Sequence, residues 1–289
     1  MISVYKKELR SYFTNMTGYI AIGLILIMIG IFVKILCLGD GGYPNMEYAL
    51  PTAAVILLLA VPIVTMRSFA EERQQKTDQL LYALPLTTVQ IVLGKYLAMM
   101  TVFAVPVAVL MLYPLILSLY GSVNFLASYA ALLLFLIMTA AMVGMCMFMS
   151  SLTESQTIAA VLGSALLIVC YFSTVLVGAL PNTAVASYLA FTVLILLVAL
   201  AIYYFVKNYW VAFSAAVVLE TANLIAYLLD KTSYAGLFQE VMGGIAIFDI
   251  FNTAVTSQLF DLTAVVYYLS IAAFFTFLTV QTVEKRRYN

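Results

Sequence analysis

The sequence contains no histidine and few charged side chains. Without histidine, the chain has no imidazole for acid–base catalysis and lacks the commonest zinc ligand in proteins. Charged residues make up 9% of the chain, whereas ordinary soluble domains carry roughly 25%. The formal net charge is zero, so the chain has no basic surface of the kind that binds nucleic acid. These absences argue against nucleic-acid binding and against histidine-dependent enzymes.

The common catalytic and nucleotide-binding motifs are also missing. The three cysteines, Cys37, Cys146 and Cys170, are not spaced as metal ligands. The one Gly-Lys pair, Gly94-Lys95, is followed by tyrosine and lacks the upstream glycine of a P-loop. We therefore expect a chain that is not an enzyme, hydrolyses no nucleotide itself and needs no cofactor or metal.

What the sequence has in abundance is apolar residues. They make up 65% of the chain, and the mean hydropathy is +1.09. We expect an all-α integral membrane protein, a polytopic helical bundle that forms a single transmembrane domain over residues 1–289. About eight spans are predicted; if 184–229 is not two full spans, the number falls to six. The predicted spans are 18–36, 50–66, 96–119, 125–150, 157–179, 184–206, 211–229 and 262–283.

Two segments outside these spans are amphipathic. Within 1–16, one helical face is apolar, and Lys6, Lys7, Glu8 and Arg10 lie elsewhere around the helix. This pattern predicts a helix in the cytoplasmic interface against lipid headgroups, the alternative being a plain extension of the first span. Residues 232–261 predict two short helices at the external membrane surface. The apolar face of the first segment consists of Ile2, Tyr5, Leu9, Tyr12, Phe13 and Met16.

The distribution of lysine and arginine fixes the predicted orientation. With eight spans, 11 of the 13 basic residues fall on the side of both termini, and only Lys34 and Lys231 fall on the other. Cytoplasmic loops carry the excess of basic residues. We therefore predict that both termini and the 67–95 loop are cytoplasmic.

The 67–95 loop is the longest polar interruption of the chain. It holds seven of the 26 formally charged residues. Pro85 interrupts its helical pattern, and Thr87 or Thr88 can cap a new helix that runs into the next span. A short helix held against the membrane is suited to docking on a cytoplasmic partner. The alternative is a solvated loop.

Glu220 is the one acidic residue near the middle of a predicted span, and Asn223 shares its helix face. A carboxylate at that depth is costly, so it should face other helices or water. Two interpretations are open: a polar point on a substrate or proton path, or an interhelical hydrogen-bonded pair.

The segment RSFAEERQQKTDQLLYALPLTTVQIVLGKYLA, residues 67–98, resembles the signature of type 2 ABC-transporter permeases. Lys76 stands where many members have glycine. Residues 150–160, SSLTESQTIAA, resemble the segment between the fourth and fifth spans of that family, and the stretch from Phe238 to Arg287 is similar to its gliding-motility-associated branch. The matching positions of the first motif are Phe69, Glu71, Glu72, Arg73, Thr77, Leu80, Leu81, Pro85, Thr87, Gly94 and Lys95.

The resemblance implies a permease subunit of an ATP-driven transporter, usually an exporter, in the bacterial cytoplasmic membrane. Its expected partners are a separate cytoplasmic ATPase subunit, membrane lipid and a second permease, identical or different, which in this branch often carries an extracytoplasmic domain. The loop after the second span would act as a cytoplasmic coupling helix, with the 151–156 turn as a second contact. The residues so assigned are Phe69, Glu71, Glu72, Arg73, Thr77, Leu81, Pro85 and Glu154.

Two rival functions remain at this point. A secondary transporter or channel without an ATPase should have several ionisable residues inside its spans, and Glu220 is essentially the only one. A membrane enzyme or scaffold should have a polar cluster near one face, and none stands out. Neither the substrate nor the choice between homodimer and heterodimer can be inferred from the sequence.

Overall fold

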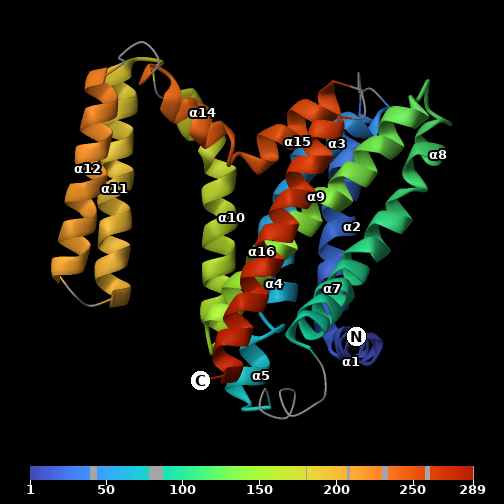
Figure 1. Cartoon of the computed structure of the whole chain (residues 1–289). Helices are drawn as coiled ribbons and strands as arrows, with labels where there is room; N and C mark the ends of the chain where they lie inside the picture. Colours follow the sequence, from blue (N-terminus) through green and yellow to red (C-terminus); the bar gives the residue numbers. More distant parts are fainter. Residues whose placement is uncertain are drawn as a thin grey trace. The chain divides into compact units, whose positions relative to one another are not determined.

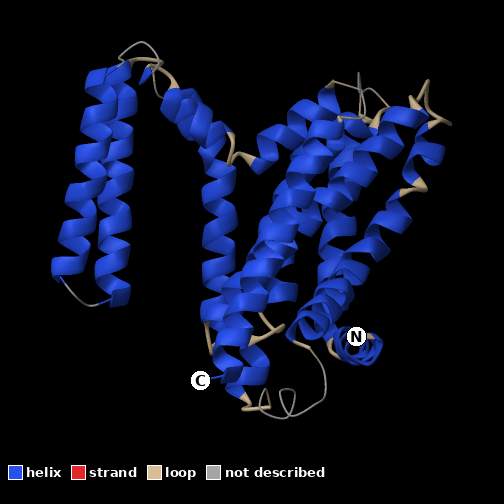
Figure 2. Ribbon diagram, in the orientation of Figure 1, coloured by secondary structure: helices blue, strands red, loops and turns tan. Residues whose placement is uncertain are grey.

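The computed structural model describes residues 1–39, 44–77, 87–179, 181–206, 209–229, 234–257 and 261–288. All regular structure among these residues is helical (Figure 2), which confirms the predicted all-α class. The chain divides into two compact units, one formed by Met1–Val169 with Ile250–Asn289 and the other by Cys170–Asp249. A single transmembrane domain over 1–289 stays a prediction.

The first unit begins with a short helix that lies across the others. Figure 1 views α1 along its axis, whereas α2, α7 and α9 run lengthwise up the page. Asn15, which separates α1 from α2, is extended (φ −89°, ψ 151°) and so breaks the helical path. The elements up to the polar loop are α1 (Ile2–Thr14), α2 (Met16–Leu36), α3 (Met46–Ala53), η1 (Ala54–Ile56), α4 (Leu57–Thr65) and α5 (Ala70–Gln74).

The core of the first unit is built around α9. It packs most extensively against α16 and also contacts α7, α4 and α3. Nearly every residue of α9 from Met138 to Met147 is buried, as expected of a helix surrounded by other helices. The elements after the polar loop are α7 (Thr88–Leu110), α8 (Tyr113–Leu117), α9 (Phe125–Leu152), α10 (Gln156–Ala179), α15 (Ile247–Thr256) and α16 (Leu262–Tyr288).

The second unit contains an antiparallel helix pair (Figure 1). It consists of α11 (Ala184–Val206) and α12 (Tyr209–Leu229), and α14 (Leu237–Gly243) packs against α11. The segment from Gly244 to Ala246 separates α14 from α15, so the predicted amphipathic stretch does contain two short helices.

Six helices among the described residues are long and apolar enough to cross a membrane. The predicted pair at 184–229 supplies two shorter apolar stretches, Ala184–Leu196 and Phe213–Leu228, so its two full spans stay a prediction. The second candidate begins at Met46, before the predicted residue 50, because the helical structure already starts there with α3, in which Met46, Ala49 and Leu50 are buried. The six candidates are Met16–Leu36, Met46–Gln74, Thr88–Leu117, Phe125–Leu152, Gln156–Ser173 and Leu262–Arg287.

Candidate functional site

The candidate site is the elbow, which we define as residues 66–77, where the chain leaves α4 and forms α5. The elbow, α1 and the C-terminal end of α16 lie at the same end of the first unit (Figure 1). Because α5 is only five residues long, it is too short to be stable as an isolated helix. Its conformation must therefore be fixed by contacts with neighbouring elements.

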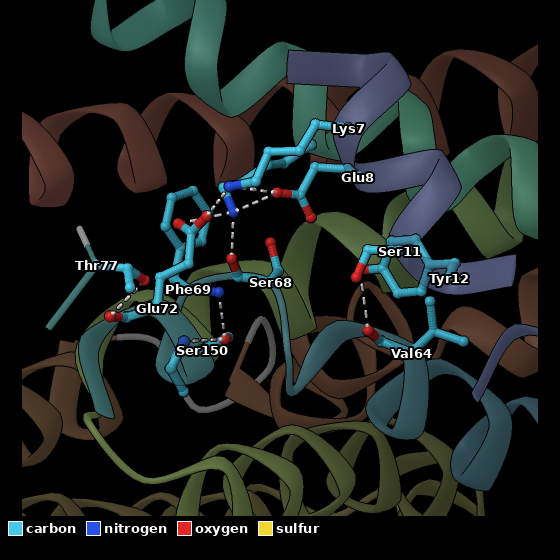
Figure 3. Close-up of polar contacts among 12 residues, drawn as sticks. Lys7, Glu8, Ser11, Tyr12, Val64, Ser68, Phe69, Glu72, Thr77 and Ser150 are labelled. Atoms are coloured by element: carbon cyan, nitrogen blue, oxygen red, sulfur yellow. Dashed lines mark hydrogen bonds and ion pairs between the residues drawn. The ribbon is translucent and has the colours of Figure 1, made fainter. Parts of the chain in front are cut away.

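The first of these contacts comes from Ser150, near the end of α9. Its Oγ accepts hydrogen bonds from the backbone N–H groups of Phe69 and Ala70, both at 3.3 Å, and donates to the carbonyl of Met66 at 3.3 Å. The first N–H groups of a helix have no partner within the helix. Ser150 supplies that partner from another element, and Figure 3 shows it directly beneath the start of α5.

The second contact joins the elbow to the C-terminal end of α9. Arg73 is buried, and its Nη1 donates to the carbonyl oxygens of Ser151 and Thr153. From α16, Arg286 donates to the carbonyl of Leu152 at 3.1 Å. Cations are favoured at this end of a helix, where the last carbonyls are unpaired and the helix dipole is negative. The elbow and the 151–156 turn are thus one connected structure.

The third contact is a buried ionic cluster centred on Lys95 of α7. Its Nζ lies 3.1 Å from Glu8 Oε1, 2.9 Å from Glu72 Oε2 and 2.6 Å from the carbonyl oxygen of Ser68. The Lys95 side chain is 1% exposed, and the Phe69 ring lies 5.1 Å from the ammonium group. A lysine has three N–H donors, so each donor has one acceptor. A buried charge needs this degree of pairing to be tolerated.

Two further residues of α1 make contacts here: Lys7 binds the elbow, and Tyr12 binds the end of α4 just before it (Figure 3). Lys7 lies 3.1 Å from Glu72, but its side chain is 61% exposed. Tyr12 is buried and donates to the carbonyl of Val64 at 3.2 Å. Burial, reinforced by the nearby Glu8 carboxylate, raises the pKa of Tyr12 above its usual value. The phenol therefore stays protonated and remains a donor across the physiological range.

The end of α5 depends on an unusual backbone conformation. Lys76 has φ +56°, which is uncommon for a residue other than glycine. Its N–H bonds the carbonyl of Arg73 at 3.0 Å, and the N–H of Thr77 bonds that of Glu72 at 2.9 Å. This is the Schellman pattern of helix termination, in which glycine usually takes the left-handed position. The left-handed position that glycine usually takes in this motif is therefore occupied here by lysine.

The start of α7 matches one of the two predicted alternatives. Thr87 is the N-cap: its hydroxyl accepts from the N–H of Gln90, and the Gln90 side chain accepts from the N–H of Thr87, both at 3.4 Å. This reciprocal pair is a capping box. The predicted proline break at Pro85 and the predicted contact at Leu81 lie outside the described residues.

The remaining predicted site residues separate into two groups. Phe69 and Arg73 are buried, and Glu72 is occupied by Lys7 and Lys95, so these three hold the elbow in place. Thr77 and Glu154 are exposed, and the Glu154 side chain, 79% exposed, lies 3.6 Å from Arg286. Gln74, Gln75 and Lys76, which are not among the predicted site residues, are exposed beside Thr77. Glu71 is partly exposed and accepts from Gln75 at 3.4 Å.

Sequence reasoning misses three of the residues that hold the elbow: Ser150, Glu8 and Lys95. It marks Lys95 only as part of a motif, and it places Glu8 among the charges away from the apolar face of the N-terminal helix. The structure corrects this, because Val4, Glu8 and Tyr12 form the buried face of α1. A spacing of four residues indicates that these side chains share one face of a helix. The charge of Glu8, in the middle of the set, makes that face look polar and so hides the pattern.

A second polar cluster lies between α11 and α12. Glu220 Oε1 accepts from Tyr188 at 2.8 Å and from Thr192 at 2.9 Å. Asn223 donates to Thr192 at 3.4 Å and accepts from Tyr234. Glu220 and Asn223 are therefore joined through Thr192, in a network between two helices. This geometry supports the interhelical interpretation, and a transport role for Glu220 stays a prediction.

No group of three or more histidine, cysteine, aspartate or glutamate side chains that could hold a metal ion occurs among the described residues. The chain was also compared with known proteins. A family profile described as "ABC-2 family transporter protein" matches residues 40–229, about two thirds of the chain, including the elbow and both helices of the second unit's pair. Among curated proteins, no match was found.

Proposed function

Since this chain belongs to the ABC-2 family of transporter proteins, we propose that it is the membrane-spanning subunit of an ATP-driven exporter and that a separate cytoplasmic ATPase subunit acts on it at the elbow. The chain is a transport component, and six of the helices that the structure describes are apolar and long enough to span a membrane. The missing P-loop means that the energy of ATP must enter from another chain. The gliding-motility branch remains the subgroup suggested by the C-terminal stretch.

The observation that carries this proposal is the way the elbow is anchored. It is bonded to α9 through Ser150 and Arg73 and to α1 and α7 through Lys95. A solvated loop would have no need of such contacts. A force applied to the elbow is passed to several helices at once.

The exposed residues of the elbow then form the proposed contact surface. Gln74, Gln75, Lys76 and Thr77 are exposed at the end of α5, and Glu154 projects from the adjacent turn. Glu72 and Arg73, which the sequence suggests as partner contacts, act instead as positioning residues in this proposal. Leu81 and Pro85 belong to the same loop and are proposed to lie at the partner's groove.

The proposed mechanism is a shift between two populated arrangements. ATP binding in the partner favours one position of the elbow, and the helices bonded to it follow as rigid bodies. Two permease subunits, identical or different, enclose the pathway, and both termini are cytoplasmic. Any extracytoplasmic domain of the transporter is supplied by the second permease.

The test is purification of the tagged chain from native membranes in mild detergent, followed by identification of its subunits and assay of ATPase activity. We expect a co-purified subunit with a P-loop that hydrolyses ATP. Charge reversal at the exposed Glu154 (Glu154→Lys) should lower the amount of that subunit retained, because interface charges govern association. The matched control is Glu240→Lys, also exposed but on α14. A chain that purifies without any ATPase, or transport driven by an ion gradient alone, would refute the proposal.

A further inference from the structure

Gly94 leaves room for the N-terminal helix to lie directly against α7. A Cβ atom at this position would be 3.2 Å from the Cβ of Val4 and 3.3 Å from the carbonyl oxygen of Met1. Contacts this short require the neighbouring atoms to move, and one of these atoms belongs to the backbone. Small residues allow helices to approach closely in membrane proteins. The absence of a side chain at Gly94 therefore sets how near α1 can come.

The next residue, Lys95, supplies the charge that α1 needs on the same face. Val4 and Glu8 are four residues apart, so they lie one above the other on α1. Val4 meets Gly94 and Glu8 meets Lys95. The steric and ionic contacts thus match residue for residue between the two helices. Tyr5 adds a third point, with its hydroxyl 3.0 Å from Thr101 Oγ1.

The orientation of the Glu8 side chain distinguishes a helix that is docked on the protein from one that lies in the membrane interface without such contacts. A floating amphipathic helix keeps its charged residues on the water side. In α1, Lys6 and Arg10 are exposed, whereas Glu8 is turned inward and 9% exposed. Burial of that carboxylate is tolerable only because Lys95 meets it. The helix therefore carries a charge that fits this protein rather than the lipid surface.

We propose that Gly94 and Lys95 form a docking site for the N-terminal helix and that Lys95 is the positioning residue that makes α1, the elbow and α7 move as one body. The movement part, that α1, the elbow and α7 move together, rests on the proposed function of the elbow. The docking part, that α1 binds at Gly94 and Lys95, does not depend on it. Lys95 binds Glu8 of α1 and Glu72 of α5 with the same ammonium group, so neither element can shift without the other.

The docking part is tested by disulfide formation in native membranes. The full-length variant Val4→Cys/Gly94→Cys, with the three native cysteines replaced by alanine, places two thiols where Cβ atoms are about 3.2 Å apart, a few tenths below the usual disulfide range. We expect rapid cross-linking on mild oxidation. Adding Lys95→Met should slow it by about tenfold or more, because one partner of a buried ion pair is lost.

Lys7→Met is the matched control for the same experiment. Lys7 is also a lysine that binds Glu72, but its side chain is 61% exposed. An exposed pair contributes little, so cross-linking should change by about twofold or less. Equal cross-linking rates in the Lys95→Met and Lys7→Met variants would overturn the docking site.

The movement part is tested by the stimulated ATPase activity of the purified complex. Lys95→Met should reduce it while Lys7→Met leaves it near that of the parent. In the Val4→Cys/Gly94→Cys background, oxidation should restore part of the activity lost with Lys95→Met, because the disulfide rejoins α1 to α7 but does not replace the contact of Lys95 with Glu72, and dithiothreitol should remove that part again. A purely structural role for Lys95 predicts no such redox-dependent recovery, and its absence would overturn the positioning role.

A third variant covers the case in which Lys95→Met fails to fold. Glu8→Gln/Glu72→Gln/Lys95→Met removes the charges of Lys95 and of both its carboxylate partners at nearly constant volume and leaves the exposed Lys7 in place, a replacement that buried ionic clusters often tolerate. We expect normal yield but slow cross-linking. Cross-linking at the parental rate would show that the ion pairs do not hold α1. If no ATPase co-purifies with the parent, the proposed function fails, and cross-linking still decides the docking site.

Discussion

The elbow and the α11–α12 pair each gather polar side chains around one central group, but they balance it differently. At the elbow, Lys95 meets two carboxylates and a carbonyl, so charge is matched by charge. In the helix pair, the Glu220 carboxylate is met by the hydroxyls of Tyr188 and Thr192. Its Oε2 atom has no hydrogen-bond partner among the described residues.

The two clusters also differ in the distance along the chain that they span. Lys95 binds Glu8 and Ser68, which precede it in the sequence by 87 and 27 positions. Glu220 binds Tyr188 and Thr192, which precede it by 32 and 28 positions and lie on one neighbouring helix. The ionic cluster fixes three elements relative to one another, and the hydrogen-bonded cluster fixes two. Loss of the central group should therefore be far more damaging at the elbow.

The largest effect is expected for Lys95→Met. The substitution leaves the buried Glu8 and the partly buried Glu72 with only the exposed Lys7 as a cation, at 3.9 Å and 3.1 Å, and removing one partner of a buried pair costs about 3–5 kcal/mol. The midpoint of thermal unfolding in detergent should fall accordingly, whereas Lys7→Met should change the stability by about 1 kcal/mol or less. Similar midpoints for the two variants would show that burial does not distinguish them.

Gly94→Ala should come next, with a loss of about 1–3 kcal/mol, since a methyl group is forced into a packed contact. The matched substitution in the second unit is Gly178→Ala, where a Cβ would meet nothing within 4 Å. That change should stabilise α10 by about 0.5–1 kcal/mol, because alanine suits a helix interior better than glycine. A lower unfolding midpoint for Gly94→Ala together with a higher one for Gly178→Ala would support the close approach of α1 to α7.

Replacing Glu220 should have a smaller effect. Glu220→Leu removes two hydrogen bonds, but the single hydroxyl proton of Thr192 can then be donated to the carbonyl of Tyr188, 2.9 Å away. Hydrogen bonds between membrane helices are worth about 0.6–2 kcal/mol, so a loss near the middle of that range is expected, and less for Glu220→Gln, which keeps an acceptor. Thermal unfolding tests stability, and transport assays on the same variants test a substrate role. A Glu220→Leu protein as unstable as Lys95→Met would contradict the comparison.

The smallest effect is expected at Lys76, and it should be favourable. A left-handed conformation costs a non-glycine residue about 1–2 kcal/mol, but the greater freedom of glycine in the unfolded chain offsets part of this gain, so Lys76→Gly should raise the unfolding midpoint only slightly. The neighbouring Gln75 has an ordinary φ of −86°, and Gln75→Gly should lower the midpoint by about 0.5–1 kcal/mol. Destabilisation by Lys76→Gly would indicate that the lysine side chain makes a stabilising contact.

Much of the fold follows from hydropathy. The fourth and eighth predicted spans, 125–150 and 262–283, lie within α9 and α16, because long apolar runs have few alternatives in a membrane. The N-cap at Thr87 follows from local backbone chemistry. The start of α3 could not be placed in this way, because Glu47 interrupts the apolar run and yet is buried.

The sequence indicates a candidate region but not its internal contacts. Charge and spacing single out the 67–95 loop, which contains Lys95 and all of the elbow except Met66. They gave no sign that Glu72 turns toward Lys95 or that Arg73 turns toward the carbonyls of Ser151 and Thr153. A sequence shows where charges are along the chain, but the partner of a buried charge depends on tertiary packing. Backbone carbonyls, which bind Arg73, have no sequence signal at all.

Ser150 illustrates what this means for reading natural variation. Replacing it with alanine leaves the charge unchanged and alters the side-chain size very little. In this protein the same exchange would remove one acceptor and one donor, leaving the N–H groups of Phe69 and Ala70 and the carbonyl of Met66 without that partner. Unmet buried polar groups cost about 1–3 kcal/mol each. A variant that looks silent in the sequence would therefore be among those that release the elbow from α9.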